Sequence, residues 1–457
     1  MIRLDNVAEY HVENFGCRAS RADGEIIGAE LRHRGLTPAL NPARADVIVA
    51  NTCSVTAQAD RTARAFLRRM RRENPTARIL VTGCYAQRAP QEVAALPGVH
   101  AVIGNSHKAL VAEIAQQAAA FVPLAALRPA PALHVDDTFA HSELSMPKSG
   151  PEAGWWAGSQ TRPNLKVQDG CGNRCSFCII PATRGHSRSL SLEACLRNVQ
   201  AFAAGGGTEL VLSGINLGRW GRDLTPQRTL EELVSAILLR TALPRLRLSS
   251  IEPMDWTPGL LALFRAHSGT PGARLARHAH LPLQSGSDAI LRAMHRRYRP
   301  WHYAEKLRLI RESMPDAGVG ADVMVGFPGE SEALFEESFA FIAAQSFTYL
   351  HLFPFSPRPD TRAWQLAREY PVPPQAVAER MARLRTLIAA RNRRFRRSFL
   401  GRELSAITLR TAQGQTTPAL TDNFLEVLLN AEVPANQSVR VVVTGLTETG
   451  LTGQLAS

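Results

Sequence analysis

Strand-like apolar runs alternate with helical patterns through the middle of this 457-residue chain, and this alternation limits the fold more than any other feature. A strand, a helix and a second strand in succession indicate a parallel α/β sheet with crossover helices. Six such units fit an open or partial (β/α) barrel better than a complete barrel of eight. The strand candidates are residues 165–168, 209–213, 246–251, 278–282, 320–325 and 349–354.

The same patterns divide the chain into five parts. Before the barrel, apolar runs at 46–50 and 78–82 flank a basic helical pattern at 57–72, which predicts a separate parallel α/β domain. A stretch rich in Pro, Ala, Gly and Ser reads as a linker. Short strand patterns close the chain and predict a small β-barrel. The predicted parts are an α/β domain at 1–125, a linker at 126–162, the barrel at 163–375, a basic helix at 376–402 and the β-barrel at 403–457.

Basic residues outnumber acidic ones by 53 to 40, and the excess is concentrated in one segment. Residues 376–402 alone carry a net charge of +8, from nine Arg and one Glu. This concentration indicates a polyanionic partner, although a solvated helix face would give the same pattern. No stretch approaches the roughly 20 apolar residues that span a bilayer, and the first residues lack the apolar block of a signal peptide. We therefore expect a cytoplasmic protein with no membrane contact.

Three of the seven cysteines, Cys171, Cys175 and Cys178, form a C-x3-C-x2-C motif directly after the first predicted barrel strand. Seven cysteines are too few for a disulfide scaffold in a chain of this length, and the odd number weakens that reading further. Thiolates grouped on one loop are typical ligands of iron–sulfur clusters, and cofactor-binding loops lie at the mouth of such barrels. Zinc would need a fourth ligand, and the nearby His186 keeps a zinc knuckle open as an alternative.

A second set, Cys17, Cys53 and Cys84, is widely spaced, yet each cysteine follows a strand-like run. Equivalent strand ends of a parallel sheet lie at one edge, so these three thiols can converge on one ligand. Three buried structural cysteines would produce the same pattern, and the spacing alone favours this second interpretation. Cys195 lies in a helical pattern and is predicted to be a core residue.

The spacing of Cys171, Cys175 and Cys178 resembles the radical S-adenosylmethionine superfamily. In that family three thiolates hold a four-iron cluster, and the amino and carboxylate groups of the cofactor's methionine occupy the remaining iron. Glycines, hydroxyl groups and an amide at later strand ends fit the resemblance. It implies cofactor contacts at Gly206, Gly207, Glu209, Ser249, Ser250, Gln284 and Gly326.

Two cysteine triads followed by a small β-domain resemble the methylthiotransferases, which combine an N-terminal cluster domain, a radical S-adenosylmethionine barrel and a TRAM domain. The segments NTCSVTAQADRTAR and VTGCYAQ are similar to the MtaB class, which acts on N6-threonylcarbamoyladenosine in tRNA. The resemblance reverses the core interpretation of Cys17, Cys53 and Cys84, because it implies that they hold a second 4Fe-4S cluster. The family commonly has Asn where this chain has Ser20, which implies an altered contact near that cluster.

The resemblance further implies an enzyme that replaces the hydrogen at C2 of an adenine next to the anticodon with a methylthio group. Both clusters would face one cavity, and a one-electron donor such as flavodoxin or ferredoxin would reduce the first. The alternatives are isopentenyladenosine in tRNA or a ribosomal-protein aspartate as substrate, and a non-catalytic iron–sulfur protein that senses RNA. Candidates for phosphate contacts to the tRNA anticodon loop are Arg391, Arg393, Arg394, Arg396 and Arg397.

Overall fold

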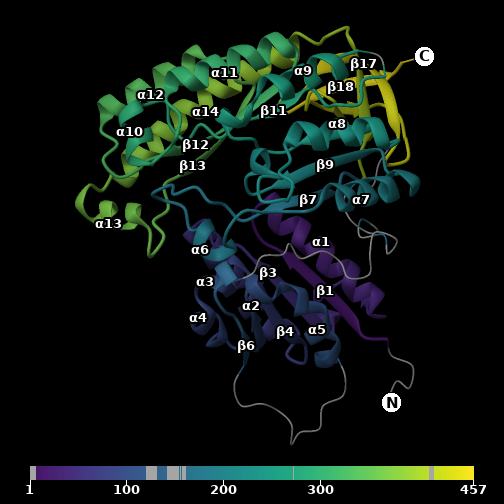
Figure 1. The fold of residues 1–457 in the computed structure, drawn as a ribbon, viewed down its shortest axis with the longest axis vertical. Coiled ribbons are helices and arrows are strands. Elements are labelled where there is room, and N and C mark those ends of the chain that lie inside the picture. The colour runs from purple at the N-terminus through teal and green to yellow at the C-terminus, as the bar shows by residue number, and fades with distance from the viewer. Residues whose placement is uncertain are drawn as a thin grey trace, which may run out of the picture. The chain divides into compact units, whose positions relative to one another are not determined.

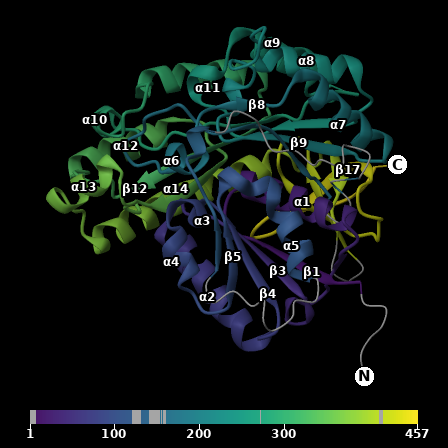
Figure 2. The same ribbon diagram turned by 60° about the horizontal axis from the view of Figure 1, so that its bottom comes forward.

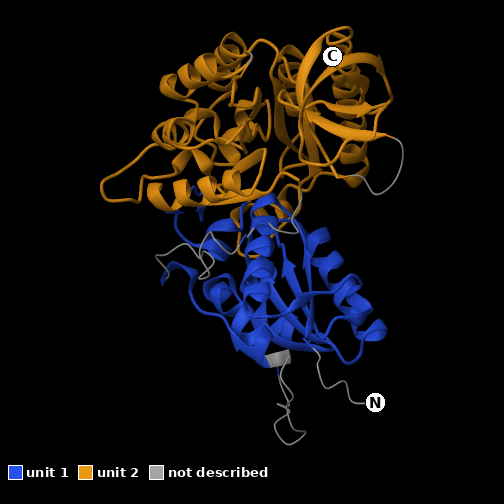
Figure 3. Cartoon of the chain, turned by 90° about the vertical axis from the view of Figure 1, so that its right-hand side faces the viewer, with its two compact units in different colours: residues 1–158, 168–174, 178–190 blue, residues 159–167, 175–177, 191–457 orange. Residues whose placement is uncertain are grey.

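The computed structural model describes residues 7–119, 131–140, 154, 156, 161–270, 272–410 and 416–456. The chain forms two compact units (Figure 3). Unit 1 comprises residues 1–158, 168–174 and 178–190, and unit 2 comprises residues 159–167, 175–177 and 191–457. The segment that carries Cys171, Cys175 and Cys178 therefore contributes to both units.

Unit 1 is a doubly wound α/β domain (Figures 1 and 2). Its strands are β1 (Glu9–Asn14), β2 (Thr37–Pro38), β3 (Val47–Thr52), β4 (Arg78–Gly83), β5 (Val99–Ile103) and β6 (Ala132–His134). Its helices are α1 (Arg18–His33), α2 (Ala57–Glu73), α3 (Cys84–Arg88), α4 (Pro90–Ala94), α5 (Val111–Ala119) and α6 (Ile180–Arg184). The six strands form one parallel sheet in the order β2-β1-β3-β4-β5-β6. This confirms the predicted parallel α/β fold.

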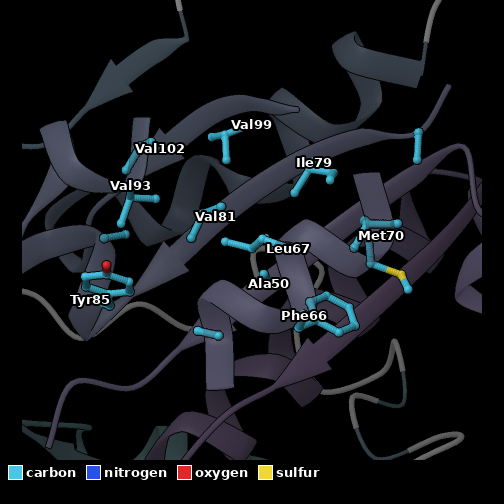
Figure 4. Packing of buried hydrophobic residues seen from close by; sticks show 14 of the residues in the cluster. Ala50, Phe66, Leu67, Met70, Ile79, Val81, Tyr85, Val93, Val99 and Val102 are labelled. Carbon is cyan, nitrogen blue, oxygen red and sulfur yellow. The ribbon is translucent and has the colours of Figure 1, made fainter. Parts of the chain in front are cut away.

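Two hydrophobic clusters cover the two faces of this sheet. Leu67 of α2 packs with Ile79 of β4 in one cluster (Figure 4), and Leu31 of α1 packs with Val49 of β3 in the other. All six residues of β3 are buried, as expected for a central strand covered on both faces. Strand β6 lies within the predicted linker, most of which falls outside the described residues. Its pairing with β5 makes this part of the linker an edge of the sheet.

Unit 2 contains the partial barrel. Its strands are β7 (Asn164–Asp169), whose last two residues belong to unit 1, β9 (Glu209–Gly214), β10 (Arg245–Leu248), β11 (His278–His280), β12 (Gly318–Val325) and β13 (Tyr349–Pro354). Strand β8 (Arg188–Ser189) lies in unit 1 and pairs with the last two residues of β7. Its helices are α7 (Leu192–Ala204), α8 (Leu230–Arg240), α9 (Pro258–His267), α10 (Asp288–Ala293), α11 (Pro300–Ser313), α12 (Glu332–Ala344) and α13 (Arg362–Glu369). The sheets β10-β9-β7-β8 and β11-β12-β13 are linked by a parallel bridge between Leu246 and Leu275. All six predicted strands are present.

The chain ends in α14 (Pro374–Arg397) and a small closed β-barrel. The barrel strands are β14 (Glu403–Thr408), β15 (Thr417–Thr421), β16 (Glu426–Leu429), β17 (Ser438–Leu446) and β18 (Leu451–Leu455), in the order β14-β15-β16-β18-β17. The sequence patterns at 405–409, 424–429 and 438–444 predict three of these five strands, β14, β16 and β17. The other two carry Pro418 and Gly453, residue types that weaken a strand pattern. Among the described residues, no helix has the length and apolar character needed to cross a membrane.

Candidate functional site

Cys17, Cys53 and Cys84 lie at the carboxyl ends of three neighbouring parallel strands of unit 1. Cys17 precedes α1 shortly after β1, Cys53 directly follows β3, and Cys84 begins α3 after β4. Gly16 lets the first loop approach the second, because its φ is +100° and a Cβ at this position would lie 2.3 Å from the Cβ of Cys53. The three cysteines therefore meet at one edge of the sheet.

The electrostatics of this edge favour a positively charged ligand. Burial raises the pKa of the Cys53 thiol to about 12, and the neighbouring sulfur atoms of Cys84 and Cys17 contribute to the rise. Like charges at such close range oppose each other's ionisation, so three thiolates need a compensating cation. Metal centres supply that charge and keep coordinating thiols deprotonated. The donor set therefore fits an iron–sulfur cluster held by three cysteines.

A buried network of charged side chains adjoins the triad. The guanidinium of Arg184 is 1% exposed and donates to both carboxylate oxygens of Asp169 and to Asp23, each at 3.0 Å. Lys108 donates to the same oxygen of Asp23 at 2.6 Å. Burial acts to lower the pKa of Arg184, but Asp169, Cys84 and Asp23 outweigh this effect and raise it. Arg184 therefore keeps its positive charge beside the cysteine sulfurs.

Two polar side chains contact the sulfur atoms directly. Asn105 Nδ2 lies 3.5 Å from Cys84 Sγ and donates to the carbonyl oxygen of Thr183 at 2.7 Å. Ser20 Oγ lies 3.8 Å from Cys17 Sγ, so the residue that replaces the family's Asn contacts a candidate ligand. Neither contact is visible in the sequence pattern, because each depends on the folded loop geometry.

Cys171, Cys175 and Cys178 occupy the loop after β7, and all three are half-buried. None of the seven cysteines, all of which lie in the described residues, forms a disulfide bond. His186, the additional ligand of the zinc alternative, packs edge-on against Phe139 with ring centroids 4.7 Å apart. Cys195 is fully buried in α7, where burial raises the pKa of its thiol, and the prediction of a core residue is confirmed.

Arg296 is a buried cation beside the barrel's cysteine loop. Within unit 2, its Nη1 donates to Cys175 Sγ at 3.2 Å, and its Nη2 pairs with Glu252. Burial acts to lower the pKa of Arg296, but Tyr298, Glu252 and Cys175 outweigh it and raise the pKa. A fixed positive charge next to a thiol stabilises the thiolate, which is the form that binds metal. The sequence gives no signal for this residue.

Three of the predicted cofactor contacts need correction. Gly206, Gly207 and Glu209 lie at the amino end of β9, whereas ligands of parallel α/β barrels bind at the carboxyl ends. Glu209 is fully buried and ion-paired with Arg247 at 2.8 Å. A Cβ at Gly207 would lie 2.2 Å from the ring of Phe202. Gly207 is therefore assigned to packing and Glu209 to a buried ion pair, whereas Gly206, with a φ of +82°, belongs to the turn that ends α7.

Buried polar atoms without a hydrogen-bond partner in the described residues occur at the carboxyl ends of three barrel strands. They are Ser213 Oγ at the end of β9, Ser249 Oγ after β10 and Gln284 Oε1 after β11. Buried polar groups are nearly always paired, so these atoms indicate a polar ligand at this edge of the barrel. The sequence reasoning missed Ser213, although it ends a strand in the same way that Ser249 does. The three atoms fit the polar groups of a cofactor such as S-adenosylmethionine.

Ser250 and Gly326 have visible structural partners. Ser250 Oγ lies 2.7 Å from Nδ1 of His280. Gly326 has a φ of +80° in the turn after β12, and its N–H donates to Glu330 at 2.7 Å. Contacts of Ser250 and Gly326 with a cofactor stay a prediction.

The five arginines predicted to bind RNA divide into two groups. Arg393, Arg394 and Arg397 are exposed on α14. Arg391 donates to carbonyl groups at the end of α12, and the buried Arg396 donates to carbonyl groups between β17 and β18. Arg391 and Arg396 therefore stabilise the packing of α14, and the three exposed arginines are the better candidates for RNA contacts.

Comparisons with known proteins match both units. Residues 9–104 match the Uncharacterized protein family UPF0004, and residues 165–342 match the Radical SAM superfamily. "Threonylcarbamoyladenosine tRNA methylthiotransferase MtaB" of Aquifex aeolicus is 33% identical, covering 94% of this chain and 99% of that protein. The protein of the same name from Bacillus subtilis is 32% identical, with coverages of 95% and 97%.

Two further comparisons bear on substrate and fold. The "tRNA-2-methylthio-N(6)-dimethylallyladenosine synthase" of Acidothermus cellulolyticus is 33% identical over 84% of this chain and 74% of that protein. The fold is similar to that of the radical S-adenosylmethionine methyltransferase TsrM from Kitasatospora setae, solved with cobalamin and a 4Fe-4S cluster. This similarity has a TM-score of 0.55 at 14% identity and covers 80% of this chain and 78% of that one.

Proposed function

The chain belongs to the MtaB-type methylthiotransferases, and on this premise we propose that it adds a methylthio group to C2 of N6-threonylcarbamoyladenosine, next to the anticodon of tRNA. The observation that carries the proposal is the match to the Aquifex aeolicus protein over nearly the full length of both chains. The match covers 94% of this chain and 99% of a single relative. The activity stated in that relative's name is therefore the best-supported activity for this chain.

The residues of the chain fit the cofactors of such a reaction. Cys171, Cys175 and Cys178 would hold a 4Fe-4S cluster, and Cys17, Cys53 and Cys84 would hold a second one. When bound, the first cluster and S-adenosylmethionine supply a 5′-deoxyadenosyl radical, and the second supplies the sulfur that is transferred. An aromatic C–H at C2 of adenine is too weakly acidic for ordinary base catalysis, which is why radical chemistry is needed.

The protein's own groups have binding and electrostatic roles. Arg296 holds a positive charge at Cys175, and Arg184 does the same beside Cys17 and Cys84. Ser213, Ser249 and Gln284 would bind polar groups of S-adenosylmethionine at the carboxyl edge of the barrel. We also propose that a flavodoxin- or ferredoxin-type donor reduces the first cluster.

A second substrate is supported by the Acidothermus cellulolyticus relative, whose name specifies N6-dimethylallyladenosine. Nucleoside analysis distinguishes the two substrates. In a strain lacking the gene, we expect the 2-methylthio derivative of threonylcarbamoyladenosine to disappear from bulk tRNA and its unmodified precursor to accumulate. The dimethylallyl derivative should persist unchanged. Mass spectrometry that finds the opposite pattern would assign the second substrate instead.

The exposed arginines of α14 are expected to bind tRNA phosphates. Replacing Arg393, Arg394 and Arg397 together with Gln should weaken tRNA binding and make the dependence of log K on log[salt] less steep by about 2, at roughly 0.7 per lost phosphate contact. Filter binding at several salt concentrations measures this slope. The control removes the same charge from α2 by replacing Arg61, Arg68 and Arg72, which are also exposed. Equal slopes for the two triple variants would contradict the assignment.

A further inference from the structure

Three side chains of types that commonly bind metals share one face of the sheet β11-β12-β13. Asp322 of β12 is the register partner of His351 in β13, and His280 of β11 is the partner of Gly320, two residues before Asp322. Alternate residues of a strand point to the same face, and neighbouring partners face together. The register therefore places His280, Asp322 and His351 side by side, and all six candidate cluster cysteines lie elsewhere in the chain.

The distances among these groups are long for hydrogen bonds between charged partners. Asp322 Oδ1 lies 3.3 Å from His351 Nδ1 and 3.5 Å from His280 Nε2, and the three ligand atoms are all within 4.8 Å of one another. Charge-assisted N–H···O bonds usually measure about 2.7–2.9 Å. In the same chain, the partly buried pair of His11 and Glu13 measures 3.0 Å. The spacing around Asp322 leaves room for an ion between the donors.

The orientation of His280 fits a ligand. Its Nδ1 lies 2.7 Å from Ser250 Oγ, which fixes the ring. Its Nε2 is buried, has no hydrogen-bond partner among the described residues and faces Asp322. Histidines that bind metals are usually oriented in this way, with one nitrogen held by a polar neighbour and the other on the ion.

The geometry is also suitable for coordination. An ion about 2.0–2.2 Å from Asp322 Oδ1 and from either histidine nitrogen would see these two donors, 3.3 or 3.5 Å apart, at an angle of roughly 100–120°, near the tetrahedral value. Two imidazoles and one carboxylate are a typical donor set for zinc and other first-row divalent metals. We propose that His280, Asp322 and His351 bind one divalent transition-metal ion, such as Zn²⁺. The His351 side chain is 54% exposed, so the remaining coordination position is open to water or to an oxygen ligand.

Zinc binding to the reconstituted holoenzyme tests this site. Under anaerobic conditions, Zn²⁺ is titrated against a chromogenic chelator, and we expect one equivalent to bind to the wild type. His351→Ala and Asp322→Asn should each weaken this binding at least tenfold, and Ser250→Ala should weaken it about tenfold through loss of the ring's support. His33→Ala, at an exposed histidine of α1, is the matched control and should bind as the wild type does.

Two further measurements keep the outcome unambiguous. Iron and sulfide contents equal to those of the wild type establish that each variant is folded and holds its clusters. X-ray absorption at the zinc edge should show nitrogen and oxygen neighbours near 2.0–2.1 Å without sulfur near 2.3 Å. The proposal is overturned if the wild type binds no zinc, if the zinc has sulfur neighbours, or if the variants at positions 322 and 351 bind zinc as tightly as the wild type.

Discussion

Replacing Cys17, Cys53 and Cys84 together with Ala is expected to abolish formation of the methylthio nucleoside while leaving reductive cleavage of S-adenosylmethionine intact. The three cysteines meet at one edge of the unit 1 sheet, and C-x3-C-x2-C is a separate ligand set on the barrel loop. If each triad holds one four-iron cluster, the variant should lose about half of its iron and acid-labile sulfide. 5′-Deoxyadenosine production by the anaerobically reconstituted, reduced protein measures the cleavage step.

The control for this variant is Cys195→Ala. Cys195 is as buried as the triad's inner cysteines but lies in α7 and belongs to neither triad, so its loss should leave the iron content unchanged. The converse variant, with Cys171, Cys175 and Cys178 replaced, should lose cleavage and transfer together. If the variant of Cys17, Cys53 and Cys84 retained all its iron, these residues would return to a structural role. If it produced no 5′-deoxyadenosine, the division of labour between the two triads would be wrong.

The features that the sequence predicts well depend on local pattern and on strand direction. Periodicity gives the six barrel strands, and the rule that parallel strands end at one edge brings Cys17, Cys53 and Cys84 together. The same rule gives Ser249, whose hydroxyl lies at the carboxyl edge of the barrel. The assignment of these cysteines to a cluster still depended on resemblance, because spacing alone favoured a core role.

The features that the sequence missed depend on partners far along the chain. Arg184 donates a hydrogen bond to Asp23, 161 positions earlier in the chain. Arg396 donates hydrogen bonds to carbonyl groups more than 50 positions later. A run of arginines looks uniform in the sequence, although only the fold decides which of them reach solvent. Glu209 shows the same difficulty, because a carboxylate beside glycines suggests a ligand contact until its arginine partners are in view.

Glu209 provides the second large expected effect, on stability. Its fully buried carboxylate accepts from Arg247 at 2.8 and 3.2 Å, and Arg162 and Arg245 lie 3.3 and 3.5 Å away. Glu209→Gln removes the carboxylate charge that these buried or half-buried guanidinium groups share, so we expect a loss of about 3–5 kcal/mol in the free energy of unfolding. Urea unfolding followed by tryptophan fluorescence measures it, since Trp220 and Trp256 are buried in the same unit. Glu193→Gln, which breaks an exposed pair with Arg240, should change the free energy of unfolding far less than Glu209→Gln does.

The pH dependence of the unfolding free energy distinguishes a buried ion pair at Glu209 from a cofactor contact. Burial acts to raise the pKa of Glu209, but Arg247, Arg162 and Arg245 outweigh it and lower the pKa from 4.5 to about 2. The folded state therefore binds the proton of Glu209 more weakly than the unfolded state does. The ionised carboxylate stabilises the fold by about 3 kcal/mol; this stabilisation is complete above pH 4.5 and is lost as the pH falls toward 2. The difference in unfolding free energy between the wild type and Glu209→Gln should be constant near neutral pH. It should become smaller as the pH falls from 4.5 toward 2. A variant that unfolds like the wild type but no longer binds S-adenosylmethionine would restore the cofactor assignment, because a buried ion pair cannot be removed without a change in stability.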